Sequence, residues 1–148
     1  MPKVIDEAKI FRTVVEILVS RGYEGATTKE IAKLAGVNEA TIFRKYGSKA
    51  GLFETAVNHQ FSETPLNNLV YTGDLKADLM TIIEVYMKTN KLYGQIIPTI
   101  LSELPRHPEL QGAFNTQWKN IQGLLEILQE YQTRGELDDE PPLSILNA

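Results

Sequence analysis

The sequence of 148 residues predicts an all-α protein, in which an N-terminal three-helix domain precedes a helical C-terminal domain. Apolar residues recur at steps of three and four residues almost throughout, which is the period of an amphipathic helix. Strand-like alternation is absent, and capping residues and glycines separate short helical segments near the N-terminus. We expect one domain over residues 1–50 and a second over residues 51–148, linked by a helix over residues 48–62.

The first predicted helix lies in the segment DEAKIFRTVVEILVSRGY. Its apolar face is formed by Ile10, Phe11, Val14, Ile17 and Leu18. Gly22 predicts the end of this helix, because glycine adopts the left-handed conformation at low cost. Thr27 and Glu30 have the spacing of a capping box, which predicts a second helix that ends at Ala35, before Gly36.

Two further helices are predicted by their capping residues. Asn38 precedes the helix EATIFRKY, and Ser48 precedes the helix KAGLFETAVNHQF. Since helices of two turns are unstable alone in water, the second and third must pack on each other and on the first. The expected core of this domain is Phe11, Val14, Leu18, Ile31, Ile42 and Leu52.

The connection between the second and third predicted helices has three residues, Gly36-Val37-Asn38, and forces a steep crossing. Ala32 permits close approach at the crossing, and Val37 with Ile42 fills the angle between the helices. This spacing is typical of a helix-turn-helix unit, whose second helix enters the major groove of DNA. A corner of two helices with the same spacing and no role in DNA binding is the alternative.

Positive charge is concentrated in this segment, although the chain has a net charge of -4. Residues 27–50 carry five Lys or Arg against two Asp or Glu. A local basic patch on an acidic protein favours a surface that faces a polyanion, because the local field governs attraction to phosphate. A solvated helix face is the alternative.

Several classes of function are not indicated by the sequence. The absence of cysteine excludes disulfides and thiolate chemistry, and His59 and His107 lack the spacing of metal ligands, so we expect no metal and no cofactor. No catalytic set or phosphate loop is found, so we expect no enzyme activity. No apolar run is long enough to span a membrane and the N-terminus lacks a signal pattern, so we expect no membrane partner and a cytoplasmic location.

The segment RGYEGATTKEIAKLAGVNEATIFRKYGSKAGLF carries a resemblance that covers residues 10–57. It resembles the DNA-binding domain of the tetracycline-repressor (TetR) family in its caps, glycines, core positions and the Ser48-Lys49 pair. The resemblance implies a transcriptional regulator, most simply a repressor that a small-molecule effector releases from a palindromic operator in double-stranded DNA. A helical protein-interaction or ligand-binding module that does not read DNA is the alternative. Phe43 departs from the family, which commonly has a phosphate-contacting tyrosine there.

The DNA-facing residues fall into two predicted groups. Those expected to contact bases are Glu39, Ala40, Thr41, Arg44 and Lys45. Arg44 offers the bidentate fork that suits guanine. Those expected at the phosphates, by the resemblance and by the donors at helix N-termini, are Thr27, Thr28, Asn38, Phe43, Tyr46 and Lys49. For Thr27 and Asn38, capping alone is the alternative role, and for Phe43 and Tyr46 it is packing.

The C-terminal half predicts two long helices. The first begins after Asp74 and is interrupted near Gly94 and Pro98, and the last begins near Leu110. This half resembles the regulatory domain of the same family, which binds effectors. An apolar or aromatic effector could lie among Met80, Tyr86, Met87, Tyr93, Phe114 and Trp118. Simple core packing is the alternative for each of these side chains.

The sequence stops at EPPLSILNA, where Leu143, Ile145 and Leu146 begin an apolar pattern without a cap. Members of the family usually continue with two more helices that form the dimer. We therefore expect a homodimer in the full-length protein, a truncated chain here, and exposed apolar surface on its last two helices.

Overall fold

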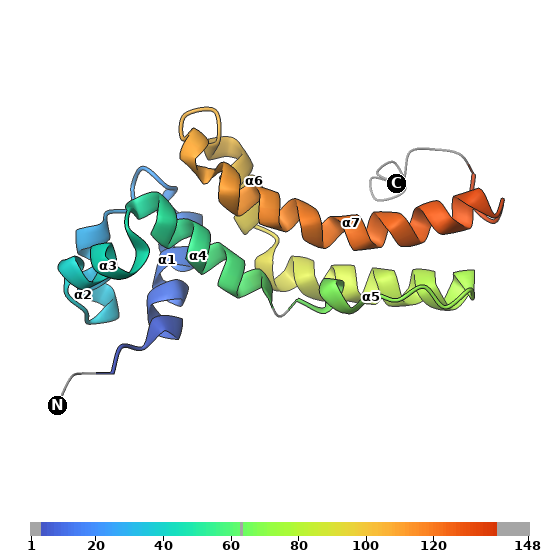
Figure 1. The fold of residues 1–148 in the computed structure, drawn as a ribbon, viewed down its shortest axis with the longest axis horizontal. Coiled ribbons are helices and arrows are strands. Elements are labelled where there is room, and N and C mark those ends of the chain that lie inside the picture. Colours follow the sequence, from blue (N-terminus) through green and yellow to red (C-terminus); the bar gives the residue numbers. More distant parts are fainter. Residues whose placement is uncertain (1–3, 63, 139–148) are drawn as a thin grey trace. The chain divides into compact units, whose positions relative to one another are not determined.

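The computed structural model describes residues 4–62 and 64–138 of the chain. Every regular element in these ranges is helical, which confirms the predicted all-α class. Figure 1 shows the elements in chain order. The α-helices are α1 (Glu7–Arg21), α2 (Thr28–Ala35), α3 (Glu39–Tyr46), α4 (Lys49–Ser62), α5 (Leu75–Tyr93), α6 (Ile96–Glu103) and α7 (Gln111–Thr133). Two short 3-10 helices complete the set, η1 (Pro65–Asn68) and η2 (Pro108–Leu110).

The described residues form two compact units. Unit one takes its residues from 1–63 and 93–117, and unit two takes its residues from 64–92 and 118–148. Unit one therefore contains the whole helix-turn-helix segment together with α6, η2 and the start of α7. The division into domains at residue 50 stays a prediction.

The predicted caps of α2, α3 and α4 are confirmed. Thr27 Oγ1 accepts the Glu30 amide at 3.1 Å, Asn38 Oδ1 accepts the Ala40 amide at 2.9 Å, and Ser48 Oγ accepts the Gly51 amide at 3.0 Å. Each bond satisfies a donor that the first turn leaves without a partner in the helix. The capping box is formed on its Thr27 side, while the Glu30 carboxylate pairs with Arg21 of α1 at 2.5 Å.

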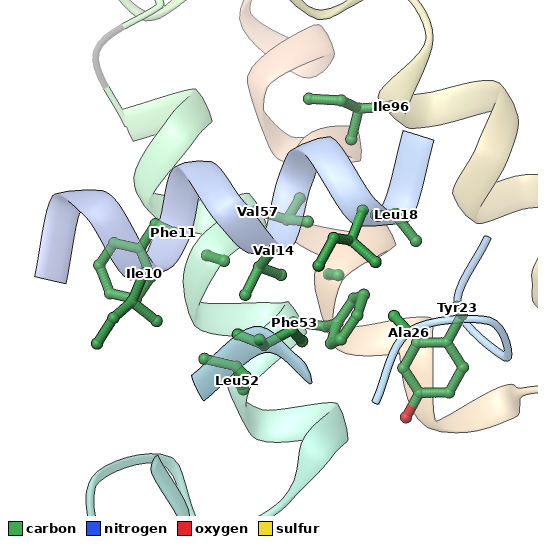
Figure 2. Close-up of a cluster of buried hydrophobic side chains, with 14 of the residues drawn as sticks. Ile10, Phe11, Val14, Leu18, Tyr23, Ala26, Leu52, Phe53, Val57 and Ile96 are labelled. Atoms are coloured by element: carbon green, nitrogen blue, oxygen red, sulfur yellow. The ribbon is translucent and has the colours of Figure 1, made fainter. Parts of the chain in front are cut away.

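One hydrophobic core holds unit one together. The six predicted core residues of the N-terminal segment are all buried, and Figure 2 shows several of them with Tyr23 and Phe53. Residues from later in the chain complete this core, among them Ile96 and Ile100 of α6 and Leu110 of η2. Removing this much apolar surface from water is the main source of stability for helices as short as α2 and α3.

Unit two has a smaller core of its own, from α5, α7 and the segment before α5. Its buried apolar residues are Ile82, Leu124, Ile127, Leu128 and Tyr131. Asp78 is buried beside them. Large apolar side chains that stay exposed on α5 are Met80, Ile83, Tyr86 and Met87.

The expectation of exposed apolar surface concerned the last two predicted helices, which correspond to α5 and α7. On α5, Met80, Ile83, Tyr86 and Met87 are exposed, whereas the described side chains of α7 include no exposed large apolar residue. The apolar pattern at residues 143–146 lies outside the described residues.

Candidate nucleic-acid interface

The turn between α2 and α3 fixes the orientation of α3. Gly36 adopts φ 71° and ψ 31°, a left-handed conformation in which a side chain would be strained. The Val37 amide bonds to the Ala32 carbonyl at 2.9 Å, which closes the end of α2. Ile42 is fully buried and anchors α3 to the core, so the opposite face of this helix points outward.

The residues predicted to contact bases lie mainly on this outward face. Ala40, Arg44 and Lys45 are exposed, and Thr41 and Glu39 are half-buried. Arg44 forms no ion pair with the described part of the chain, so its planar guanidinium is exposed to solvent. Phe43 is 43% exposed, which places an apolar ring among these polar side chains.

Lys45 and Tyr46, at the end of α3, are both bound to the start of α1. Glu7 Oε1 lies 2.7 Å from Lys45 Nζ and accepts the Tyr46 hydroxyl at 3.1 Å. The bonds from Lys45 and Tyr46 lower the pKa of the Glu7 carboxyl. A contact between Lys45 and DNA would require Lys45 to release or share the Glu7 carboxylate. The sequence did not indicate that Glu7 binds the end of α3.

The ring of Tyr46 is half-buried and packs against Phe11, with the ring centres 5.8 Å apart. Its hydroxyl lies on Glu7, and burial followed by this bond raises the pKa of Tyr46 to about 12. Packing, the alternative considered for this residue, therefore accounts for its position, and a phosphate contact stays a prediction.

The starts of α2 and α3 lie together. The Thr28 hydroxyl donates to Glu39 Oε2 at 3.5 Å, the long limit of a hydrogen bond. Thr27 and Asn38 are exposed beside them, and their side-chain oxygens are engaged as caps. These residues, predicted at bases or phosphates, are thus brought to one side of the helix pair.

Lys49 begins α4, and its ammonium lies over an aromatic ring. Nζ is 4.1 Å from the centre of the Tyr23 ring, within the range of a cation–π interaction. Burial lowers the pKa of Lys49, and the carboxylates of Glu109, Glu24 and Glu103 act in the opposite direction. Sequence reasoning missed Tyr23, although an aromatic residue directly after the end of α1 was a visible signal.

The predicted effector residues fall in both units. Met80, Tyr86 and Met87 are exposed on α5, and Phe114 packs against the core of unit one. The side chains of Tyr93 and Trp118 lie outside the described residues. Met80 also lines an open hollow of about 850 Å³ with Leu75, Leu79 and Ile83 of α5, and Lys76, Gly73, Asp74 and Glu136 complete its lining. The effector site stays a prediction.

The described residues contain no group of three or more His, Cys, Asp or Glu placed to hold a metal ion. Within the same ranges, no helix combines the length and the apolar character needed to cross a membrane.

The chain is similar to known bacterial regulatory proteins. Residues 10–56 match the family described as bacterial regulatory proteins, tetR family. The chain is 40% identical over 130 residues to YvkB of Bacillus subtilis (strain 168), an uncharacterized HTH-type transcriptional regulator; the match covers 86% of this chain and 67% of that protein. It is 25% identical over 108 residues to the DNA-binding transcriptional repressor TetR of Mycobacteroides abscessus (strain ATCC 19977), covering 72% of this chain and 56% of the repressor.

A solved structure has a similar fold. The flavonoid-responsive regulator FrrA superposes with a TM-score of 0.67 at 21% identity, covering 95% of this chain and 75% of the regulator. The chain spans about two thirds of the length of the curated relatives that it matches over most of its own length.

Proposed function

This chain belongs to the TetR family of DNA-binding transcriptional regulators, and we propose that it is a repressor that leaves its operator when a small molecule binds. Regulators of this family bind DNA operators and small-molecule effectors, usually as dimers. Repression is supported by the similarity to the repressor of Mycobacteroides abscessus. The proposal gives the protein a cytoplasmic location and no catalytic role.

One observation carries the proposal. α3 is anchored by the buried Ile42 and presents Arg44 outward, while the starts of α2 and α4 place donors and Lys49 in the same unit. A helix held in this way offers base contacts from one face, and the flanking helix starts offer phosphate contacts that fix its register.

The roles of the side chains follow from their chemistry. We assign Arg44 to guanine, Ala40 and Thr41 to thymine methyl groups, and Glu39 to a cytosine amino group. Thr27, Thr28, Asn38 and Lys49 are assigned to phosphates, with Phe43 and Tyr46 beside them. The ion pair with Glu7 makes Lys45 the weakest of the proposed base contacts.

Two copies on a palindromic operator would place their α3 helices about 34–36 Å apart, or a multiple of that distance. We propose that the effector favours a spacing that does not fit the operator, because a ligand shifts an equilibrium only by its differential affinity. The exposed apolar side chains on α5 support an apolar or aromatic effector. Homodimerisation, the operator and the effector all belong to the proposal.

The test begins with selection from randomised duplexes, followed by binding measurements at several salt concentrations. A regulator is expected to select a palindrome and to bind more weakly as salt rises, because phosphate contacts release counterions. Binding without sequence preference, or no binding, would favour the alternative of a helical protein-interaction or ligand-binding module. Sedimentation with the selected duplex then counts the copies bound.

The effector is tested on the same duplex. Apolar and aromatic compounds are screened by the fluorescence of Trp118, the single tryptophan, and each binder is added to the protein–DNA complex. Binders that release the DNA support the proposed coupling. Binders that change the fluorescence and leave the affinity for DNA unchanged contradict it.

A further inference from the structure

The ammonium group of Lys49 is held by an aromatic surface at the start of α4. Its Nζ lies 4.1 Å from the centre of the Tyr23 ring and 5.9 Å from the centre of the Phe53 ring. The negative face of an aromatic ring attracts a cation, and a long lysine side chain loses freedom when it is held there. Lys49 is thus oriented before any phosphate is present.

Tyr23 is itself immobilised by its neighbours. The residue is 4% exposed, and its ring meets those of Phe53 and His107 edge to face, with centres 4.9 and 4.8 Å apart. Burial, and then the charge and hydrogen bonding of Glu109, raise the pKa of Tyr23 to about 12, so the phenol stays neutral at physiological pH. A fixed, neutral ring is a suitable platform for a cation.

Two carboxylates, from the end of α6 and from η2, lie near this platform. His107 lies between two carboxylates, with Nε2 at 3.8 Å from Glu103 Oε2 and Nδ1 at 3.4 Å from Glu109 Oε1. Both Glu103 and Glu109 attract the Lys49 ammonium, as does Glu24 after α1. The same charges repel the phosphate that Lys49 is proposed to bind.

The close fit of α6 against α1 keeps the Glu103 carboxylate in place. Gly22 has φ +74°, and a Cβ added to it would lie 2.6 Å from Glu103 Oε1. The Glu103 carboxylate therefore occupies the space that any side chain at position 22 would need. A displacement of the end of α6 would therefore move the Glu103 carboxylate away from Gly22, at the end of α1.

We propose that Tyr23 is a positioning residue for the phosphate contact of Lys49, and that Glu109 opposes this contact. The inference rests on the proposed function, since it needs Lys49 to meet DNA. In this arrangement the ring holds the ammonium at the start of α4, and the carboxylate reduces its net attraction for phosphate. The segment between α6 and α7 thereby sets the strength of a contact made by α4.

The test uses two replacements of the same shape at Tyr23. Tyr23→Phe keeps the negative ring face, whereas Tyr23→pentafluorophenylalanine reverses it. We expect the fluorinated variant to bind every duplex about threefold to tenfold more weakly than Tyr23→Phe, with unchanged base preference. Equal affinities of the two variants would overturn the proposal, because either ring could fill the same space if Tyr23 had a purely structural role.

Lys49→Met provides the coupling measurement. In this background the difference between the two Tyr23 variants is expected to vanish, because there is no cation for the ring to hold. A difference that persists without the cation would contradict a positioning role. Thermal unfolding of each variant by circular dichroism shows separately any change in stability.

Glu109→Gln tests the opposing charge, with Glu16→Gln of α1 as the matched control because Glu16 is exposed and does not act on Lys49. We expect Glu109→Gln to strengthen DNA binding about twofold to threefold more than the control, and only when Lys49 is present. An equal effect of both replacements would mean that the change in overall charge, and not the position of Glu109, alters DNA affinity. That result would overturn the proposed opposing role of Glu109.

A measurement without DNA separates this inference from the proposed function. With lysines labelled by reductive methylation, the Lys49 methyl signal is expected upfield in NMR spectra, because it lies over the Tyr23 ring. Loss of this shift in Tyr23→Leu, with the other lysine signals unchanged, supports the geometry. A normal shift in the unchanged protein overturns the inference alone, whereas absence of DNA binding overturns the proposed function and the phosphate role together.

Discussion

The two compact units are stabilised in different ways. Unit one encloses a broad apolar core to which α1, α2, α3, α4, α6, η2 and α7 contribute. Unit two has far fewer buried apolar residues, and its buried carboxylate, Asp78, accepts hydrogen bonds from Thr72 and Tyr131. Unit one also buries a carboxylate, that of Glu103 at the end of α6, but beside a much larger apolar core. Because apolar burial is non-directional and a buried charge must be bonded, the second unit depends on particular hydrogen bonds much more than the first.

Asp78 joins two parts of unit two. Its Oδ2 accepts the hydroxyl of Tyr131 of α7 and, at 2.9 Å, the amide of Thr72, while its Oδ1 accepts the Thr72 hydroxyl at 2.5 Å. Burial acts to raise the pKa of Asp78, but the bonds from Thr72, Tyr131 and Gly73 outweigh it and lower the pKa. The carboxylate is therefore ionised in the folded protein and ties the segment before α5 to α7.

The two units also differ in the side chains that they expose. Unit one exposes polar and cationic groups on α3 beside Phe43, whereas α5 in unit two exposes four large apolar side chains. The first pattern suits a hydrated, charged partner, and the second suits an apolar one. The two surfaces thus differ in polarity, as the two cores differ in what stabilises them.

The largest effect is expected from Ile42→Ala, which tests the dependence of unit one on its apolar core. Ile42 is fully buried, so the replacement should lower the free energy of unfolding by about 2–5 kcal/mol. Chemical denaturation measures this loss, and Ile42→Val is the control, expected to cost about 0.5–1.5 kcal/mol. A loss below that of the control would show that α3 is not held by this core.

Asp78→Asn tests the dependence of unit two on its carboxylate. Because the folded pKa is depressed, the stabilisation by Asp78 is complete above the unfolded value of about 3.9 and is lost as pH falls through the lower folded value. The variant should be less stable at pH 7 and should lack this part of the acid dependence. Amide hydrogen exchange in α5 and α7, followed between pH 7 and pH 3, measures this change in the stability of unit two.

Asp74→Asn is the control for that experiment, because Asp74 is exposed at the start of α5 and its Oδ1 caps the Ala77 amide. An asparagine also serves as a cap. If both replacements changed exchange equally, the buried network would have no special part in unit two.

Arg44→Ala and Lys49→Ala separate base specificity from overall DNA affinity within unit one. Arg44→Ala should reduce base preference by about 1–3 kcal/mol at one operator position. Lys49→Ala should weaken binding to all duplexes and lower the salt slope by about one. Affinities across a library of sites measure both, and uniform losses in both variants would refute the assigned roles.

The smallest effect is expected from Asn38→Ala, which removes the cap of α3. The lost bond to the Ala40 amide should cost about 0.5–2 kcal/mol of stability. Asn38→Ser, which can still cap, is expected to recover most of it. DNA affinity measured on both variants then shows whether Asn38 also contacts DNA. If Asn38 only caps α3, the serine variant should bind DNA as tightly as the unchanged protein.

The local features of unit one could be predicted from the sequence. α2 and α3 end at the predicted residues, their caps are Thr27 and Asn38 as expected, and the six predicted core residues are buried. These features depend on residues no more than four positions apart or on the apolar period of one helix, and the sequence displays both directly. The outward position of Arg44 follows from the same period.

Which distant residues meet depends on how the helices pack. Tyr46 reaches Glu7 across 39 positions, Tyr131 reaches Asp78 across 53, and two of the three acids that act on Lys49, Glu103 and Glu109, come from later in the chain. Sequence reasoning assigned Lys45 and Tyr46 to DNA because it could not show the carboxylate that engages them. Helix periodicity determines which face of a helix is buried, but the partner of each polar side chain depends on how the helices are packed, and that is decided by the core as a whole.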